Sequence, residues 1–203
     1  MKKINILLLG SFIFTCSFSL AQVEVNVGDS SALDKIKALE FYNAGIEIFN
    51  AKDYPNSILQ FDSAILISPD YEKAYFNRGS AKYQLKDFTN AISDFDKSIE
   101  LSPDSSKAYY LRGRSYQELK NDDNALKDYN DAIRVNKANA QAYYYRGGYF
   151  FLEEKYKEAI SDYSNAVKNK PDYAYAYNDR ASAKRLSNDL NGAIKDYQKA
   201  LLV

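Results

Sequence analysis

Arginine at a fixed spacing is the most regular charged feature of this sequence. Four arginines lie 34 residues apart, and an aspartate follows each one after sixteen residues: Arg78, Asp94, Arg112, Asp128, Arg146, Asp162, Arg180 and Asp196. A row of guanidinium groups could bind the carboxylates or phosphates of a ligand. The alternative is an Arg–Asp pair within or between repeating units. The first unit has Ala44 and Gln60 in place of both partners, and this joint loss favours a structural ion pair that fixes the register of the units.

Side chains that commonly carry out catalysis are scarce. The sequence contains no His, and its one cysteine, Cys16, lies in an N-terminal segment that we expect to be removed. The common general base, the common zinc ligands and the Cys or Ser–His nucleophiles are therefore missing. No glycine-rich phosphate loop is present, and the carboxylates fall at repeat positions. We expect no enzymatic activity, no cofactor and no metal.

The charged columns belong to a 34-residue repeat, which must position them. Each copy begins with an aromatic residue, in the order Phe41, Tyr75, Tyr109, Tyr143 and Tyr177. A small residue follows four positions later, at Gly45, Gly79, Gly113, Gly147 and Ala181. The second half of each copy carries another aromatic residue, at Phe61, Phe95, Tyr129, Tyr163 and Tyr197. A fixed period of this length is typical of solenoid proteins.

The spacing within each copy predicts two antiparallel helices. Aromatic and glycine four residues apart share one face of a first helix, and small residues on the second helix permit close packing. Pro69, Pro103 and Pro171 end the second helix, because proline cannot continue it. The expected pairs are 38–51 with 54–67, 72–85 with 88–101, 106–119 with 122–135, 140–153 with 156–169, and 174–187 with 190–202. We expect one solenoid domain over 38–203, with repeats at 38–71, 72–105, 106–139, 140–173 and 174–203.

This pattern of aromatic, glycine, alanine, aromatic, alanine and proline resembles the tetratricopeptide repeat family. The resemblance covers residues 38–203 and implies an all-α fold, a right-handed α-solenoid of antiparallel helix pairs. Three positions depart from the pattern: Asp122 replaces an aromatic residue, Ala181 a glycine and Lys137 a proline. These departures predict looser turns in the third and fifth copies.

The resemblance also implies that the first helices line a concave groove. The predicted groove residues are Tyr42, Asn43, Phe49, Phe76, Asn77, Tyr83, Lys107, Tyr110, Arg114, Tyr144, Tyr145 and Phe151. Tyrosine gives a large contact area and is enriched at protein interfaces, so this face suits a protein or peptide ligand. The alternative is that these rings only pack against one another. Some family members clamp the C-terminal carboxylate of chaperones, but only Asn77 and Lys107 match that clamp, which excludes this ligand.

The first 21 residues have the pattern of a secretory signal peptide. Lys2 and Lys3 precede an apolar run, and small residues near Ala21 suit a signal peptidase. A retained membrane anchor and a lipoprotein with Cys16 as the lipidated residue are the alternatives. We expect a flexible lead at 22–37 and export to a bacterial periplasm or the cell exterior, with no membrane span in the mature chain.

The charge of the mature chain argues against nucleic acid as a partner. Removal of the two lysines lowers the number of basic side chains from 27 to 25 against 27 acidic ones, which gives a net charge near −2. The end of the chain, Leu201-Leu202-Val203, is apolar and has no polar helix after it to cover the last unit. We therefore expect an interaction scaffold, with a structural subunit that forms a homodimer through this end as the alternative. A glycan is a further candidate ligand for the tyrosine-rich face.

Overall fold

The computed structural model describes residues 30–203, and the predicted signal peptide at 1–21 and residues 22–29 lie outside it. Within the described residues the chain forms ten α-helices and no strand. They are α1 (Ser30–Asn50), α2 (Tyr54–Ile67), α3 (Glu72–Gln84), α4 (Phe88–Leu101), α5 (Ser106–Glu118), α6 (Asp122–Val135), α7 (Ala140–Leu152), α8 (Tyr156–Asn169), α9 (Ala174–Leu186) and α10 (Leu190–Ala200). Apart from α1, these bounds agree within two residues with the predicted helix pairs.

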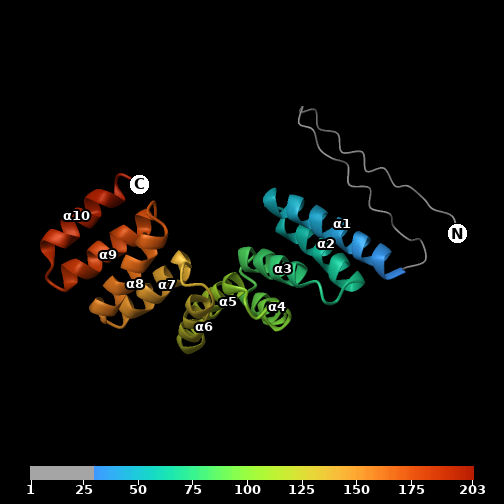
Figure 1. Ribbon diagram of the computed structural model, residues 1–203, viewed down its shortest axis with the longest axis horizontal. Coiled ribbons are helices and arrows are strands. Elements are labelled where there is room, and N and C mark those ends of the chain that lie inside the picture. Colours follow the sequence, from blue (N-terminus) through green and yellow to red (C-terminus); the bar gives the residue numbers. More distant parts are fainter. Residues whose placement is uncertain (1–29) are drawn as a thin grey trace, which may run out of the picture.

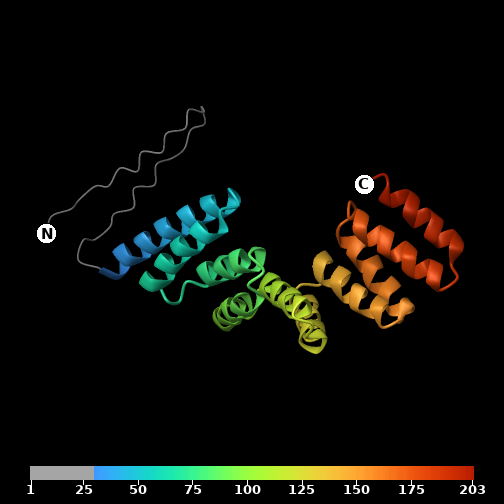
Figure 2. The same cartoon turned by 180° about the vertical axis from the view of Figure 1, so that it is seen from behind.

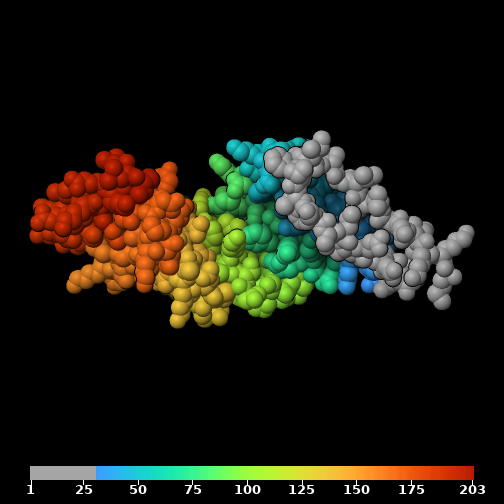
Figure 3. All heavy atoms as spheres, turned by 45° about the horizontal axis from the view of Figure 1, so that its top comes forward, coloured from blue at the N-terminus to red at the C-terminus, as the bar shows by residue number. Residues whose placement is uncertain are grey.

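The helices form an extended arc with α1 and α10 near its two ends (Figure 1). Each helix packs against the next, and each first helix also contacts the first helix of the following unit. The view from behind shows the same succession of hairpins (Figure 2). In the space-filling view the units from α3 onward lie in one unbroken row (Figure 3). The fold is therefore the all-α solenoid that the repeat predicts, with α1, α3, α5, α7 and α9 side by side.

Helix α1 corrects the predicted N-terminal boundary. It begins at Ser30, so the described part of the lead predicted at 22–37 is helical and continuous with the first repeat. A shallow pocket lies beside this part of the helix, lined by Lys35, Ala38 and Leu39 together with the turn that joins α2 to α3. The repeat pattern alone does not indicate the extra turns of α1.

The turn inside each unit uses a left-handed residue, and in every unit but the fourth a side chain caps the second helix. The residues at φ between 56° and 69° are Lys52, Lys86, Lys120, Glu154 and Asn188. In the second unit the amide N–H of Lys86 donates to the Tyr83 carbonyl at 3.0 Å, and that of Asp87 donates to the Lys82 carbonyl at 2.9 Å. This bond pattern closes the end of a helix in the Schellman manner. The Asp87 carboxylate then caps α4 by accepting from the Asn90 amide.

The prediction of looser turns in the third and fifth units is wrong. Lys120 and Asn188 have the same left-handed conformation as their counterparts, with φ of 60° and 69°. Where Lys137 replaces proline, Asn139 caps α7 and also donates from Nδ2 to the Ser106 hydroxyl at 2.8 Å. That hydroxyl donates in turn to the Ala132 carbonyl. A buried hydrogen-bond network therefore takes over the role of the proline.

Each of the first four units closes around a glycine that lies against an aromatic ring of the second helix. A Cβ on Gly113 would approach the ring of Tyr129 to 2.9 Å, and one on Gly79 would approach the ring of Phe95 to 3.0 Å. Gly45 and Gly147 make equivalent contacts with the second-helix rings of their own units. Since real Cβ atoms scarcely come this close, the missing side chain is what lets the two helices meet. The rings of Phe61, Phe95 and Tyr129 are fully buried.

The structure brings together all four predicted Arg–Asp pairs. Each arginine donates from both Nε and Nη2 to the two oxygens of the aspartate sixteen residues later, at distances from 2.6 to 3.0 Å. The aspartates are almost fully buried, and the arginine side chains are less than a quarter exposed. This bidentate geometry joins the two helices of a unit and leaves little of either group for a ligand.

The same arginines also reach the preceding unit, which the sequence analysis did not anticipate. The remaining terminal nitrogen, Nη1, donates to a residue on the second helix of the unit before. Its acceptors are Asp62 for Arg78 at 2.6 Å, Asp96 for Arg112 at 2.6 Å, Asn130 for Arg146 at 2.7 Å and Ser164 for Arg180 at 3.1 Å. Each arginine therefore connects three helices and fixes one unit against the next.

We call the four Arg–Asp pairs the ion-pair ladder. Its aspartates differ in how burial and neighbouring cations shift the pKa of their carboxyls. Burial raises the pKa of the Asp128 carboxyl, and Arg112 offsets this only in part. At Asp196 burial also acts to raise the pKa, but hydrogen bonds from Arg180 and Lys184 outweigh it and lower the pKa. A lysine contributes a second cation 2.8 Å from the carboxylate in the fifth unit, as Lys82 does in the second. The third unit, with Tyr116 at that position, relies on its arginine alone.

A double-mutant cycle tests whether Arg112 and Asp128 act as a pair. We expect Arg112→Leu and Asp128→Leu each to lower the free energy of unfolding by roughly 3–5 kcal/mol, because each leaves the other charge buried without its partner. We expect the double variant to lose much less than the sum of the two, since no isolated charge remains. Urea unfolding followed by circular dichroism measures the three values, and simple additivity would contradict the pairing.

Candidate functional site: an aromatic groove along the first helices

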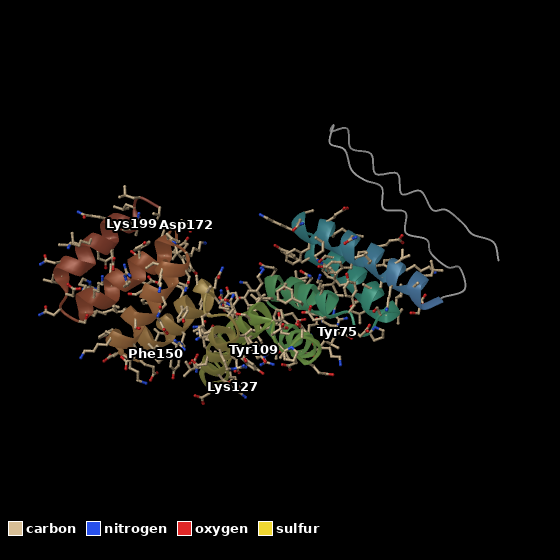
Figure 4. All side chains as sticks on the ribbon, viewed as in Figure 1. Tyr75, Tyr109, Lys127, Phe150, Asp172 and Lys199 are labelled. Atoms are coloured by element: carbon tan, nitrogen blue, oxygen red, sulfur yellow. The ribbon has the colours of Figure 1, made fainter. Side chains whose placement is uncertain are left out.

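The predicted groove residues lie on four adjacent first helices. Tyr42, Asn43 and Phe49 are on α1, and Phe76, Asn77 and Tyr83 are on α3. Lys107, Tyr110 and Arg114 are on α5, and Tyr144, Tyr145 and Phe151 are on α7. Each first helix contacts the next. Side chains on one face of these helices therefore lie in neighbouring rows. Figure 4 shows side chains of all units on the ribbon, with Tyr75, Tyr109 and Lys127 labelled along the lower edge of the arc.

Three of the predicted residues serve packing within their own unit. Phe49, Tyr83 and Phe151 each meet an aromatic residue five positions later in an edge-to-face contact, with ring centroids 5.3 to 5.7 Å apart. These contacts close the turn between the two helices. The third unit has Gln117 and Asp122 at the two places, and there Gln117 instead accepts a hydrogen bond from the Tyr129 hydroxyl at 2.9 Å.

At the N-terminal end of the groove, Tyr42 is tied into the structure. Its ring lies 5.0 Å from that of Tyr71 and 6.0 Å from that of Phe61. Its hydroxyl accepts a hydrogen bond from Nδ2 of Asn77 at 3.1 Å, which connects the first two units. Burial raises the pKa of the Tyr42 hydroxyl. Asn77 therefore serves an internal contact, whereas Asn43 is exposed and makes no hydrogen bond within the described residues.

Four of the predicted groove residues lie on the adjoining helices α3, α5 and α7, and we call them the central cluster: Tyr83, Tyr110, Arg114 and Tyr145. The guanidinium carbon of Arg114 lies 4.0 Å from the centroid of the Tyr145 ring and 5.5 Å from that of Tyr83. Tyr110 and Tyr145 have centroids 5.7 Å apart. Burial raises the pKa of the Tyr110 hydroxyl to about 12. The cluster spans three units and holds a cation against aromatic rings, whose faces attract it.

The arginine of the central cluster differs from the arginines of the ion-pair ladder. Its one carboxylate contact within the described residues is with Glu118 at 3.5 Å, a long ion pair at a half-exposed glutamate. Lys107, on the same helix, is exposed and has no ion pair within the described part of the chain. The Arg114 side chain is as buried as those of the ladder arginines, with 19% exposed against 14 to 20%. It differs from them in its lack of a close carboxylate partner, and Lys107 is the more exposed of the two cations.

Towards the C-terminal end, Tyr144 forms a contact with a residue that the sequence analysis missed. Its hydroxyl donates to Oδ2 of Asp179 on α9 at 2.7 Å, and its ring lies 4.9 Å from that of Tyr173. Burial, with this hydrogen bond, raises the pKa of the Tyr144 hydroxyl. Asp179 has the same repeat position as Asn77 and Tyr145, since it lies 102 residues after the first and 34 after the second. Extending this position to the fifth unit would have identified it.

The chemistry available to this groove is recognition. Burial raises the pKa of Tyr110, Tyr144 and Tyr173, so these hydroxyls stay protonated at neutral pH and are poor bases and nucleophiles. Among residues 30–203, no three His, Cys, Asp or Glu side chains gather where they could hold a metal ion. In the same range no helix is long and apolar enough to cross a membrane.

Solved structures with the same fold include several repeat proteins. MamA from Desulfovibrio magneticus RS-1 superposes with a TM-score of 0.70 at 20% identity, over 81% of this chain and 93% of that one. YrrB, described as a TPR protein with an unusual peptide-binding site, gives 0.65 at 17% identity, over 85% and 89%. TTC0263, a TPR protein from Thermus thermophilus, gives 0.65 at 19% identity, over 81% and 90%. These similarities establish the fold alone.

Family models give the more specific result. Models of the tetratricopeptide repeat match residues 72–105, 110–164 and 153–202, which together exceed half of the sequence. No curated protein matches the sequence significantly. The matched segments coincide with the helical hairpins and with the glycine–aromatic contacts described above, and the chain belongs to the tetratricopeptide repeat family.

Proposed function

We propose that this chain is a non-catalytic scaffold that binds an extended segment or a helix of a partner protein in its aromatic groove. The observation that carries the proposal is the central cluster, where the guanidinium carbon of Arg114 lies 4.0 Å from the centroid of the Tyr145 ring in the middle of the row of first helices. Rigid aromatic rings and an oriented arginine are the residues that dominate binding energy at protein interfaces. The peptide-binding site named for YrrB supports the same use of the fold.

Export is part of the proposal and rests on the sequence of residues 1–21. A basic start, an apolar run and small residues before position 22 are the features that a secretory pathway reads. A scaffold of this kind would meet its partner in the periplasm or outside the cell. The mature chain needs no disulfide there, because its stability comes from packing between units.

A second candidate function is assembly through the C-terminal unit. Ile133 and Val167 occupy the same repeat position and pack near Ala142 and Ala176 of the following unit. Leu201 has this position in the fifth unit and is 87% exposed, beside a pocket of about 470 Å³ between α9 and α10. Analytical ultracentrifugation decides this point, since a monomer at micromolar concentration would exclude self-assembly through this end.

An arginine variant tests the groove as the binding site. Peptides selected from a random displayed library on the purified protein are expected to bind Arg114→Gln at least tenfold more weakly, because the variant loses the charge and the stacked guanidinium. The matched control is Lys127→Gln, since Lys127 projects from α6 at the outer edge of the arc (Figure 4) and should leave the affinity unchanged. Fluorescence anisotropy gives both dissociation constants. Equal affinities for wild type and Arg114→Gln would show that the selected peptides bind elsewhere.

The N-terminus of the exported protein tests the secretion proposal. We expect mass spectrometry of the protein recovered from its producing cells to find Gln22 as the first residue. A lipid-modified Cys16 would show that the chain is a lipoprotein. An intact residue 1 in the membrane fraction would show a retained anchor, and either result would contradict cleavage after Ala21.

A further inference from the structure

The tyrosines of the second helices extend a hydroxyl past the glycine of their unit towards the first-helix face. In the third unit the Tyr129 hydroxyl donates to Gln117 at 2.9 Å. In the fifth unit the Tyr197 hydroxyl lies 3.1 Å from the Ser182 hydroxyl, within hydrogen-bond distance. The first two units have Phe61 and Phe95 at this position and carry no hydroxyl there. In these four units, therefore, the second-helix aromatic residue either has a hydroxyl with a hydrogen-bond partner inside its unit or has no hydroxyl.

Tyr163 in the fourth unit is the exception. The side chain is buried, with 2% of the residue exposed, and its hydroxyl makes no hydrogen bond to any of the described residues. Every fully buried polar side-chain atom among these residues does have a partner, so the Tyr163 hydroxyl must reach the surface at its tip. A polar group that is largely buried without a partner is stabilised by a hydrogen bond that a ligand supplies.

A glycine opens the space in front of this hydroxyl. Gly148 takes the place that Ser182 has in the fifth unit, and a Cβ on it would meet a single heavy atom within 4 Å, the Tyr163 hydroxyl oxygen at 3.8 Å. We call this space the Gly148 gap. The neighbouring Gly147 differs, because a Cβ there would come within 2.9 Å of the Tyr163 ring.

Nothing in the fold of the described chain requires glycine at position 148. The residue lies inside α7, and no glycine in residues 30–203 has a positive φ. A side chain would fit, and glycine in a helix interior is unfavourable relative to almost any other residue. Its presence therefore costs stability while it exposes the Tyr163 hydroxyl to the groove.

The electrostatic surroundings of the gap select the charge of its occupant. Burial raises the pKa of Tyr163, and the negative charges of Asp179 and Asp162 raise it further. Arg146 neutralises Asp162 through a bidentate ion pair. Within the described residues Asp179 is partnered only by neutral donors, the Tyr144 hydroxyl and the Asn178 amide, so its oxygens keep unused lone pairs. A negative field with two oxygen acceptors favours a cation that donates hydrogen bonds.

The walls of the gap suit an aliphatic stem. Tyr144, Phe151 and Ile160 pack around the cluster that contains Tyr163, and the Tyr144 ring lies 5.8 Å from the Tyr163 ring. Such rings can cover methylene groups and also attract an ammonium group by their faces. A compact ammonium group also fits a gap of one missing side chain better than a planar guanidinium does.

We propose that the Gly148 gap is a subsite for a lysine side chain of the bound segment. The lysine stem lies against Tyr144 and Phe151, and its ammonium group donates to the Tyr163 hydroxyl oxygen and to the Asp179 carboxylate. This inference rests on the proposed function of the groove. It adds a charge preference: a basic residue of the partner binds at α7 and α9, one unit away from Lys107 and Arg114 of α5.

The test uses an array of random N-acetylated dodecapeptides on the purified protein. Peptides that bind wild type are expected to contain lysine, and acetylation of that lysine should weaken binding about tenfold. Gly148→Ser should weaken binding of the unacetylated peptides to a similar degree, because the new hydroxyl pairs with Tyr163 as Ser182 does with Tyr197. Tyr163→Phe, which reproduces the first two units, and Asp179→Asn should each weaken binding and reduce the effect of acetylation.

Thermal unfolding separates these effects from misfolding. Gly148→Ser is expected to melt at or above the temperature of wild type, since it removes a helical glycine, so weaker binding by this variant cannot be caused by instability. Lys127→Gln again serves as the matched surface control, with unchanged affinity.

Three results would overturn the inference, and they differ in what else they overturn. If the peptides lose affinity with Arg114→Gln but bind Gly148→Ser as tightly as wild type, the lysine subsite is wrong and the groove remains the binding site. If a parallel array with free N-termini yields binders that need the terminal amine and no lysine, the ammonium comes from a chain end instead. If wild type retains no peptide from either array, both the subsite and the proposed function fail.

Discussion

The structure depends on arginines that each connect three helices. Arg112 donates two hydrogen bonds to the nearly fully buried Asp128 of its own unit and a third to Asp96 of the unit before. Hairpins with one apolar face could slide or rotate against each other, because apolar contact is not directional. A planar guanidinium with fixed donor directions permits one arrangement. Repetition of this contact at each junction after the first unit sets the angle between units, and thereby the course of the groove.

The first helices that carry the arginines of the ion-pair ladder also carry the residues of the predicted groove. On each first helix the ladder arginine and the glycine turn towards the second helix, and the groove residues occupy the remaining rows. Arg112 and Arg114 illustrate the division, because they lie two residues apart and differ in surroundings: one is held by two carboxylates, the other by Tyr145 and Tyr83. The first fixes one unit against the next, whereas the second lacks a close carboxylate partner.

Sequence periodicity predicted most of the fold, because each repeated column has one physical role. The glycine, aromatic and Arg–Asp columns keep their chemistry in most units, with Ala181 in the fifth unit and Ala44 and Gln60 in the first as exceptions. The structure places the glycines, the second-helix aromatic residues and the Arg–Asp pairs at helix contacts. The second acceptors of the arginines were missed because their column changes from Asp62 to Asn130 to Ser164. The helical start at Ser30 was missed because it lies before the first repeat. The unpaired hydroxyl of Tyr163 was missed because it depends on the absence of a side chain at Gly148. A single repeat position compared between units does not show this.

The changing acceptors also divide the solenoid into two halves with different connections. Towards the N-terminus, Arg78 and Arg112 meet carboxylates of the preceding unit, whereas Arg146 and Arg180 meet an amide and a hydroxyl. Hydrogen bonds between two charged groups are stronger than those with one neutral partner. Hydrogen bonds between first helices supply further connections in both halves, as when Asn77 donates to Tyr42 of the unit before and Tyr144 donates to Asp179 of the next unit. Residues of the predicted groove therefore also help to hold the units together. Under the proposed function, a ligand that engages Tyr144 would act directly on a junction between two units.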